Sequence, residues 1–251
     1  MKRLLTTVFI SIILSTPIAA QSTTDVLINA DQLYNTRDVN THFQQCIDLL
    51  NKHLLTTTAP NLKYELLWRL ARTGSQVPYY IDGTDAELLT QIEASIAAGD
   101  QALILQPNSI VPLYWKSIAI GRHAEIKGIL KSLKSVKPIR NNMNTIIKAD
   151  PTFHRAYFVL SRLHRKAPKF ISIGNPEKSL DYITTALQYD PTESIYLLEK
   201  ARVLKKLGKK DQAAAVVNTL LALPENDPKY FADQVRRDKL AGLELGVIAN
   251  K

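Results

Sequence analysis

The sequence is poor in the residues that define several protein classes. Among its 251 residues there is a single cysteine, Cys46, which excludes an internal disulfide framework and a zinc site built from several cysteines. Nine glycines and twelve prolines are too few for a collagen-like or low-complexity protein. No segment alternates polar and apolar residues as a half-buried β-strand does. The chain is therefore expected to be all-α.

Motifs for catalysis and cofactor binding are also missing. The sequence has no phosphate-binding loop, no His-Glu-x-x-His zinc motif, no Cys-x-x-Cys pair and no Gly-x-Ser-x-Gly elbow. Cys46 lies in an apolar helical stretch, where a buried, unreactive thiol is expected. His154 and His164 do not share a face of their predicted helix. The sequence therefore predicts a protein that is not an enzyme and has no cofactor and no metal site.

Residues 1–20 have the pattern of a cleavable secretory signal. Lys2 and Arg3 precede an apolar run over 4–15, which is too short to span a bilayer comfortably, and Ala20 offers a small residue at the cleavage point. The alternative is an uncleaved membrane anchor. We expect cleavage after Ala20, a mature chain of 21–251, and a periplasmic or secreted location.

A helix that ends in Asp-Pro or an equivalent pair recurs along the chain. Pro107, Pro151 and Pro191 follow one another at spacings of 44 and 40 residues, and a weaker version lies at 224–228. Periods of this size indicate a helical repeat array. The unit at 192–224 has the length and pattern of a tetratricopeptide repeat, and its apolar positions are Leu197, Ala201, Leu204, Ala213, Val217 and Leu220.

Looser versions of the same unit account for the rest of the chain. The predicted architecture of 21–251 is a right-handed superhelical solenoid of about five tetratricopeptide-like helix pairs and a C-terminal capping helix. The predicted pieces are a first pair at 25–34 and 40–55, a second helix at 86–105 after a connection at 74–85, insertions at 128–137 and 167–174, and a capping helix at 230–248.

Positive charge is concentrated in the middle of the chain. The formal net charge is +9, and residues 116–178 alone contain 14 basic and 3 acidic residues. Basic residues three to four apart alternate with apolar ones at Lys127, Lys131, Lys134, Lys137 and Arg140. Such an amphipathic segment suits an anionic surface or an acidic partner, or else is a solvated helix face with its apolar side in the core. No stacking aromatic motif accompanies it, so no nucleic-acid partner is expected.

Two arginine-containing stretches, 67–72 and 121–128, define a second candidate site. First helices of neighbouring repeats line the concave side of a solenoid. We predict a partner-binding set of Arg69, Arg72, Arg122, Glu125 and Arg162. Three of these arginines, Arg72, Arg122 and Arg162, are expected to converge as bidentate donors for a carboxylate.

The alternative is that these arginines pair with acidic residues of the chain and hold the repeats in register. Glu65, Glu125 and Asp150 are the acidic residues that this alternative invokes. Trp68, Trp115 and Tyr157 are expected in the core or the groove wall.

Taken in order, Leu67-Trp68-Arg69-Leu70-Ala71-Arg72, the Gly-Arg-x-Ala-Glu-x-Lys-Gly core of 121–128 and the two Asp-Pro helix ends at 150–151 and 190–191 resemble the regulator of microtubule dynamics family. That resemblance covers about residues 60–225. It implies a tetratricopeptide-like helical fold and a binding scaffold without catalytic residues, and in eukaryotes it implies association with microtubules and organelles.

The expected function is an exported, non-catalytic scaffold that binds a protein or peptide, which an acidic sequence would suit, on the concave face of the solenoid. Two alternatives stay open at this point. One is attachment to an anionic envelope surface, lipid or cell wall, through 127–140. The other is a solute-carrier component of a transport system.

Overall fold

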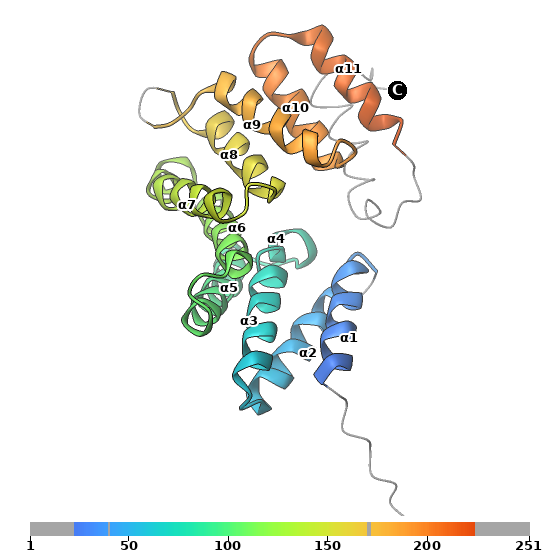
Figure 1. The fold of residues 1–251 in the computed structure, drawn as a ribbon, viewed down its shortest axis with the longest axis vertical. Coiled ribbons are helices and arrows are strands. Elements are labelled where there is room, and N and C mark those ends of the chain that lie inside the picture. Colours follow the sequence, from blue (N-terminus) through green and yellow to red (C-terminus); the bar gives the residue numbers. More distant parts are fainter. Residues whose placement is uncertain (1–22, 40, 170–171, 224–251) are drawn as a thin grey trace, which may run out of the picture.

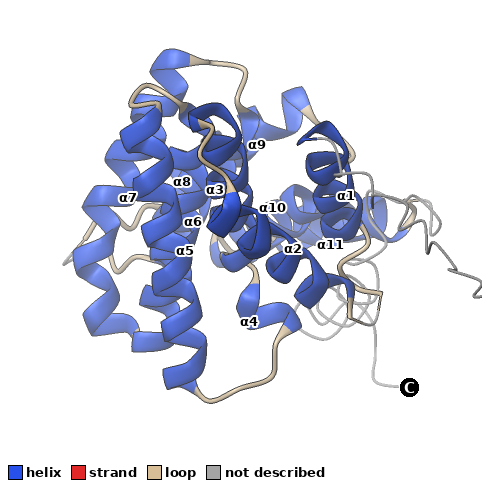
Figure 2. Cartoon of the chain, turned by 90° about the horizontal axis from the view of Figure 1, so that it is seen from below, coloured by secondary structure: helices blue, strands red, loops and turns tan. Residues whose placement is uncertain are grey.

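The computed structural model describes residues 23–39, 41–169 and 172–223. Every regular element in these ranges is a helix, joined to the next by loops and turns (Figure 2). The helices are α1 (Thr23–Asn35), α2 (His42–Thr56), α3 (Pro60–Gly74), α4 (Val77–Tyr80), α5 (Asp85–Leu105), α6 (Ile110–Lys127), α7 (Ile129–Ala149), α8 (His154–Lys166), α9 (Pro176–Tyr189), α10 (Ser194–Lys206) and α11 (Lys210–Leu221).

Apart from the single turn α4, these helices form five antiparallel pairs that stack into a curved array (Figure 1). The pairs α1–α2 and α10–α11 lie at the two ends of the array. Helices α5, α6 and α7 lie between these ends, on the left in Figure 1. Each pair packs on the next one, so the core is a row of local clusters. The predicted all-α solenoid of about five helix pairs is confirmed.

Proline positions explain several helix ends. Helices α5, α7 and α9 end at Leu105, Ala149 and Tyr189. These ends lie just before Pro107, Pro151 and Pro191, as predicted. Proline lacks an N–H and disfavours helical geometry in the residue before it, so each helix has to end there.

Side-chain caps are found at the N-termini of α5 and α9, which are the second helices of their pairs. Thr84 and Glu87 form a capping box at α5, in which each side chain bonds to the backbone N–H of the other residue. At α9, the Asn175 side chain accepts a bond from the Lys178 N–H at 2.8 Å, and Pro176 takes the first helical position. These caps fix the register at which the two helices enter the stack.

The predicted insertion at 128–137 is wrong. Residues from Ile129 onward already belong to α7, and Gly128, with a φ of 87°, is the whole connection between α6 and α7. A left-handed φ is accessible to glycine without steric cost, so one residue suffices to reverse the chain. Further along α7, Ile139, Met143 and Ile146 are buried in the core.

Two other connections are confirmed. The segment 167–174 separates α8 from α9, and the connection that follows Gly74 contains α4 before α5 begins at Asp85. The predicted signal at 1–20 and the predicted capping helix at 230–248 lie outside the described residues. Among the described helices, none combines the length and the apolar character needed to cross a membrane.

Small residues allow neighbouring helices to approach closely, both within a pair and between pairs. Ser161 on α8 and Ser179 on α9 are fully buried, and each hydroxyl bonds to the carbonyl of the other residue, at 2.9 and 2.8 Å. On α5, a Cβ added at Gly99 would lie 2.8 Å from Cβ of Lys116 on α6. The spacing between α5 and α6 therefore depends on glycine at position 99.

Replacing Gly99 with Ala is expected to destabilise the protein by about 1 to 2 kcal/mol, because the cost of overpacking exceeds the gain in helix propensity. Gly121 is a matched control in the middle of α6, where a new Cβ would be 3.7 Å from its neighbour, Cδ1 of Ile139. Gly121→Ala should stabilise by up to about 1 kcal/mol. Thermal unfolding of both variants checks the opposite signs, and equal effects would contradict the packing argument.

Candidate partner-binding site

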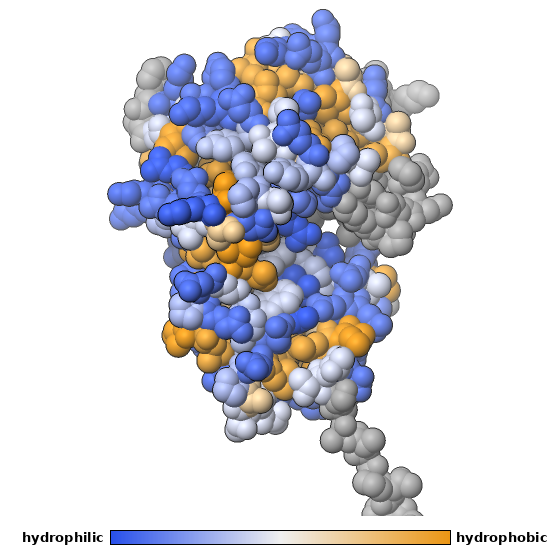
Figure 3. Space-filling model, in the orientation of Figure 1, coloured by the Kyte–Doolittle hydropathy of each residue, from blue (hydrophilic) through white to orange (hydrophobic). Residues whose placement is uncertain are grey.

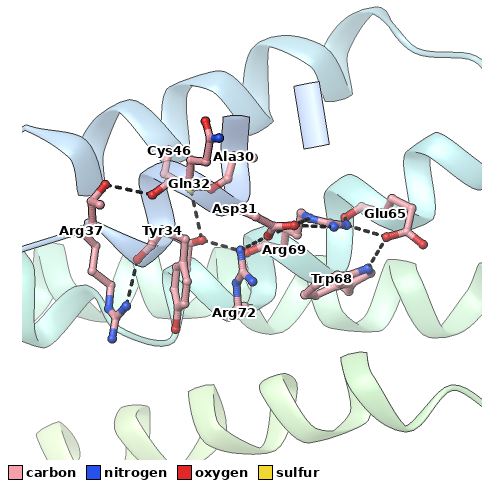
Figure 4. A network of polar contacts seen from close by, with 12 residues as sticks. Ala30, Asp31, Gln32, Tyr34, Arg37, Cys46, Glu65, Trp68, Arg69 and Arg72 are labelled. Carbon is pink, nitrogen blue, oxygen red and sulfur yellow. Dashed lines mark hydrogen bonds and ion pairs between the residues drawn. The ribbon is translucent and has the colours of Figure 1, made fainter. Parts of the chain in front are cut away.

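The first group of predicted arginines belongs to a polar network between α1 and α3. We call it the Asp31 cluster, made of Asp31, Glu65, Trp68, Arg69 and Arg72 (Figure 4). Arg69 donates to Asp31 through Nε, at 3.1 and 3.2 Å from the two oxygens, and through Nη2 at 2.8 Å. Arg72 Nη2 bonds to Asp31 Oδ1 at 2.7 Å, and Arg69 Nη1 also bonds to Glu65. One carboxylate of α1 thus holds two guanidinium groups of α3.

This cluster is balanced in charge and enclosed by aromatic rings. The Arg69 guanidinium lies 4.2 Å from the centre of the Trp68 ring, and that of Arg72 lies 3.8 Å from the centre of the Tyr34 ring. Burial opposes the ionisation of Asp31, but the hydrogen bond from Arg69 and the charge of Arg72 outweigh it and lower the pKa of this carboxyl. The arrangement suits a structural joint between the first two helix pairs.

A second network joins α6 to α8. We call it the Glu125 cluster, made of Arg122, Glu125, Arg162 and Lys166. Arg122 Nη1 bonds to Glu125 Oε2 at 2.9 Å. Arg162 Nη2 and Lys166 Nζ bond to the other oxygen, Oε1, at 3.0 and 2.6 Å. Here one carboxylate meets three cations, so the cluster carries a net positive charge.

The electrostatics of the Glu125 cluster follow from this imbalance. Burial by itself would raise the pKa of Glu125, but the charges of Arg162 and Arg122 and the bond from Lys166 hold it at about 2. Burial and the nearby Arg162 charge lower the pKa of Lys166. The Arg122 guanidinium lies 4.5 Å from the centre of the Tyr79 ring, in the connection before α5. Glu125 stays ionised at any physiological pH.

A separate ion pair joins α8 to α10. Arg165 donates from Nε and Nη2 to the two oxygens of Glu199, at 2.7 and 2.9 Å. Glu199 is only 1% exposed. Lys206 of α10 also bonds to the carbonyl oxygen of Arg165. This bidentate pair is neutral and closes the joint between the last two described helix pairs.

The structure separates the arginines that were expected to converge. Arg122 and Arg162 come together at Glu125, whereas Arg69 and Arg72 contact Asp31. Two of the acidic residues named in the alternative do hold arginines: Glu65 holds Arg69, and Glu125 holds Arg122 and Arg162. The third, Asp150, accepts instead from the N–H and hydroxyl of Thr152 in the turn before α8. That the set binds a partner stays a prediction.

Sequence reasoning missed several members of these networks. Asp31, Tyr34 and Tyr79 lie far along the chain from the arginines that they contact, and no local spacing signals them. Lys166 could have been predicted from the sequence, because it follows Arg162 by four residues and so lies on the same face of α8.

The basic segment does not form one helical face. Lys127 ends α6 before the break at Gly128, whereas Lys131, Lys134, Lys137 and Arg140 belong to α7. Lys134 and Lys137 are exposed and Arg140 is half-buried, while only the backbone of Lys131 is described. Strongly hydrophilic residues gather over α7 in Figure 3, and hydrophobic residues appear as separate patches.

Cys46 of α2 and the two histidines of α8, His154 and His164, make contacts typical of structural residues. Cys46 is buried, its Sγ bonds to the Ala30 carbonyl oxygen at 3.3 Å, and burial raises the pKa of the thiol. His154 Nδ1 lies 2.8 Å from the Tyr196 hydroxyl, and His164 stacks on Tyr182. Within the described ranges, no three His, Cys, Asp or Glu side chains gather as a potential metal site.

Trp68, Trp115 and Tyr157 are half-buried. The two tryptophans pack against the same core cluster, which includes Leu67 and Ala98. Tyr157 packs against another core cluster and bonds through its hydroxyl to the Pro151 carbonyl oxygen at 3.1 Å.

The stacked helix pairs, with ion-paired joints between their first helices, define a tetratricopeptide-like α solenoid. The chain belongs to the regulator of microtubule dynamics family, because the family model described as regulator of microtubule dynamics protein 1-3 matches residues 26–243. Comparison with curated protein sequences gives no match.

A solved structure supports the same fold. A thermophilic tetratricopeptide-repeat protein of Thermus thermophilus is 16% identical, with a TM-score of 0.64 over 87% of this chain and 98% of that one. Structural similarity to MamA of Desulfovibrio magneticus RS-1 is lower, with a TM-score of 0.46 over 81% of this chain and 97% of that one, at 17% identity.

Proposed function

We propose that this protein is a non-catalytic scaffold that binds a protein or peptide on the face formed by its first helices, and that it is exported to the cell envelope. The observation that carries the binding proposal is the Glu125 cluster, where three cations of α6 and α8 share one carboxylate. The secretory pattern of residues 1–20 supports export. The helical-repeat fold supports a scaffold, since stacked helix pairs form extended binding surfaces.

One observation supports the alternative of attachment to an anionic envelope surface through 127–140. Lys134 and Lys137 are exposed on α7 and form no ion pair among the described residues, whereas Lys127 Nζ lies 3.8 Å from Glu93 Oε1. Their charges are available to an anionic lipid or cell-wall surface. The solute-carrier alternative stays a prediction that no observation on the described residues favours.

One experiment separates the two candidates. Wild type, Arg122→Gln/Arg162→Gln and Lys134→Gln/Lys137→Gln are purified from the envelope fraction, where a mature N-terminus at Gln21 is expected, and used as bait in chemical cross-linking with envelope extract. The first double variant should form at least about tenfold fewer cross-links than wild type, because charge-assisted hydrogen bonds to the partner are removed. The second should keep them.

Thermal unfolding of both variants is the control for folding. If Arg122→Gln/Arg162→Gln melts like wild type and still captures the same proteins, the first-helix face is not the binding site. If only Lys134→Gln/Lys137→Gln loses association, and does so with anionic vesicles as well, the alternative is correct.

A further inference from the structure

The Asp31 cluster and the Glu125 cluster differ in charge balance. The Asp31 cluster contains two guanidinium groups and two carboxylates. In the Glu125 cluster both carboxylate oxygens are already occupied, yet two positive charges remain uncompensated. The side chains of Arg122 and Arg162 are only 12% and 24% exposed, and cations with little access to water favour anionic partners, so this excess indicates where an external anion is favourable.

Unused hydrogen-bond donors accompany this charge. Arg122 Nε is buried without a hydrogen-bond partner in the described structure, as is Arg72 Nε of the Asp31 cluster, so neither atom is open to a ligand from solvent. Lys166 carries three donors, and its bond to Glu125 uses one of them. An incoming carboxylate therefore finds the excess positive charge and the two remaining donors of Lys166 Nζ.

A third cation extends the positive surface along α8. Arg155, Arg162 and Lys166 are separated by seven and four residues, which places them on one face of the helix. Arg155 is exposed and has no acidic partner among the described residues.

The length of this row defines the size of the ligand. A helical rise of 1.5 Å per residue puts Arg155 and Lys166 roughly 16 Å apart along α8. An extended peptide advances about 3.3 Å per residue, so about five residues cover the row. Alternate residues of an extended strand lie about 6.6 Å apart on one face, close to the spacing of about 6 Å between Arg162 and Lys166 along α8, so acidic residues at every second position face these two cations together.

We propose that the row Arg155–Arg162–Lys166, with Arg122 beside it, binds an extended acidic peptide segment of about five residues with carboxylates at alternate positions. This inference rests on the proposed scaffold function and names the chemistry of its partner. Glu125 acts within it as an internal carboxylate that holds the cations in place and competes with the ligand for them.

Binding of a fluorescent peptide with glutamates at alternate positions, measured by anisotropy, tests the proposal. Its controls are the same peptide with glutamines and a scrambled peptide of equal charge. Wild type should bind the alternating glutamate peptide at least about tenfold more tightly than the glutamine peptide, with affinity falling as salt rises. Arg162→Gln and Lys166→Gln should each weaken it about tenfold, and the exposed-lysine control Lys148→Gln should not.

Glu125→Gln gives the opposite sign and separates recognition from stability. Loss of the competing charge should tighten peptide binding severalfold at low salt while lowering Tm, whereas a purely structural cluster would change Tm alone. Equal binding of the glutamate and glutamine peptides by wild type would overturn the acidic-peptide proposal. If cross-linking in extract still depended on Arg122 and Arg162, the scaffold function would stand without it.

Discussion

Replacing Glu199 with Ala is expected to lower the free energy of unfolding by about 3 kcal/mol or more. The Glu199 carboxylate is 1% exposed and holds Arg165, whose side chain is 16% exposed. The variant leaves this guanidinium in a buried site without its anion, and it also removes the joint between α8 and α10. Chemical denaturation at neutral pH, followed by circular dichroism, measures the loss.

A paired substitution is the control for this result. Arg165→Met/Glu199→Leu removes both charges and fills the site with apolar side chains, so it should recover most of the stability lost by Glu199→Ala. A Glu199→Ala variant within about 0.5 kcal/mol of wild type, the range of an ordinary surface substitution, would contradict the assignment of this pair as a buried joint.

Replacing Asp31 with Ala is the second large expected effect, a destabilisation of about 2 kcal/mol. Asp31 bonds to Arg69 and Arg72, whose side chains are 10% and 11% exposed, and it connects α1 to the rest of the array. Because Asp31 itself is about one-third exposed, water lessens the loss. Amide hydrogen exchange should accelerate in α1 and α2 more than in α8 to α11.

The pH dependence of this contribution has a defined sign. The pKa of Asp31 is lowered below 3.8 in the folded protein, so its contribution is complete above the ordinary carboxyl range and disappears as the pH falls through the lowered pKa. Wild type should lose more stability than Asp31→Ala on acidification below about pH 4. Asp48→Ala, at an exposed position on α2, is the control and should stay within about 0.5 kcal/mol of wild type.

The helix pairs were predictable because their signals are local. Proline after a helix, an Asn-Pro-Glu start at 175–177 and small residues at contact positions all act within a few residues. Gly128 shows the limit of this reasoning. A break in the repeat length indicates extra residues, but only the backbone geometry reveals that they lengthen α7 instead of forming a loop.

The candidate site was only half predictable because it depends on contacts between repeats. Arg122 and Glu125 are three residues apart, and their pairing follows from helix geometry. Asp31 contacts Arg69 and Arg72, which are 38 and 41 residues away along the chain. These contacts depend on how α1 packs on α3. The charge balance within each cluster, on which the proposed binding surface rests, is visible only after these partners are known.

The neighbour-only packing of the array has a consequence for how the chain acquires its structure. Substantial contacts between described helices join elements that are close in sequence, such as α8 with α9 and α3 with α6. Each pair can therefore form as soon as it and its neighbour are available, without waiting for a distant segment. Folding can begin at either end and spread pair by pair, so an array of this kind tolerates the gradual emergence of its chain during synthesis.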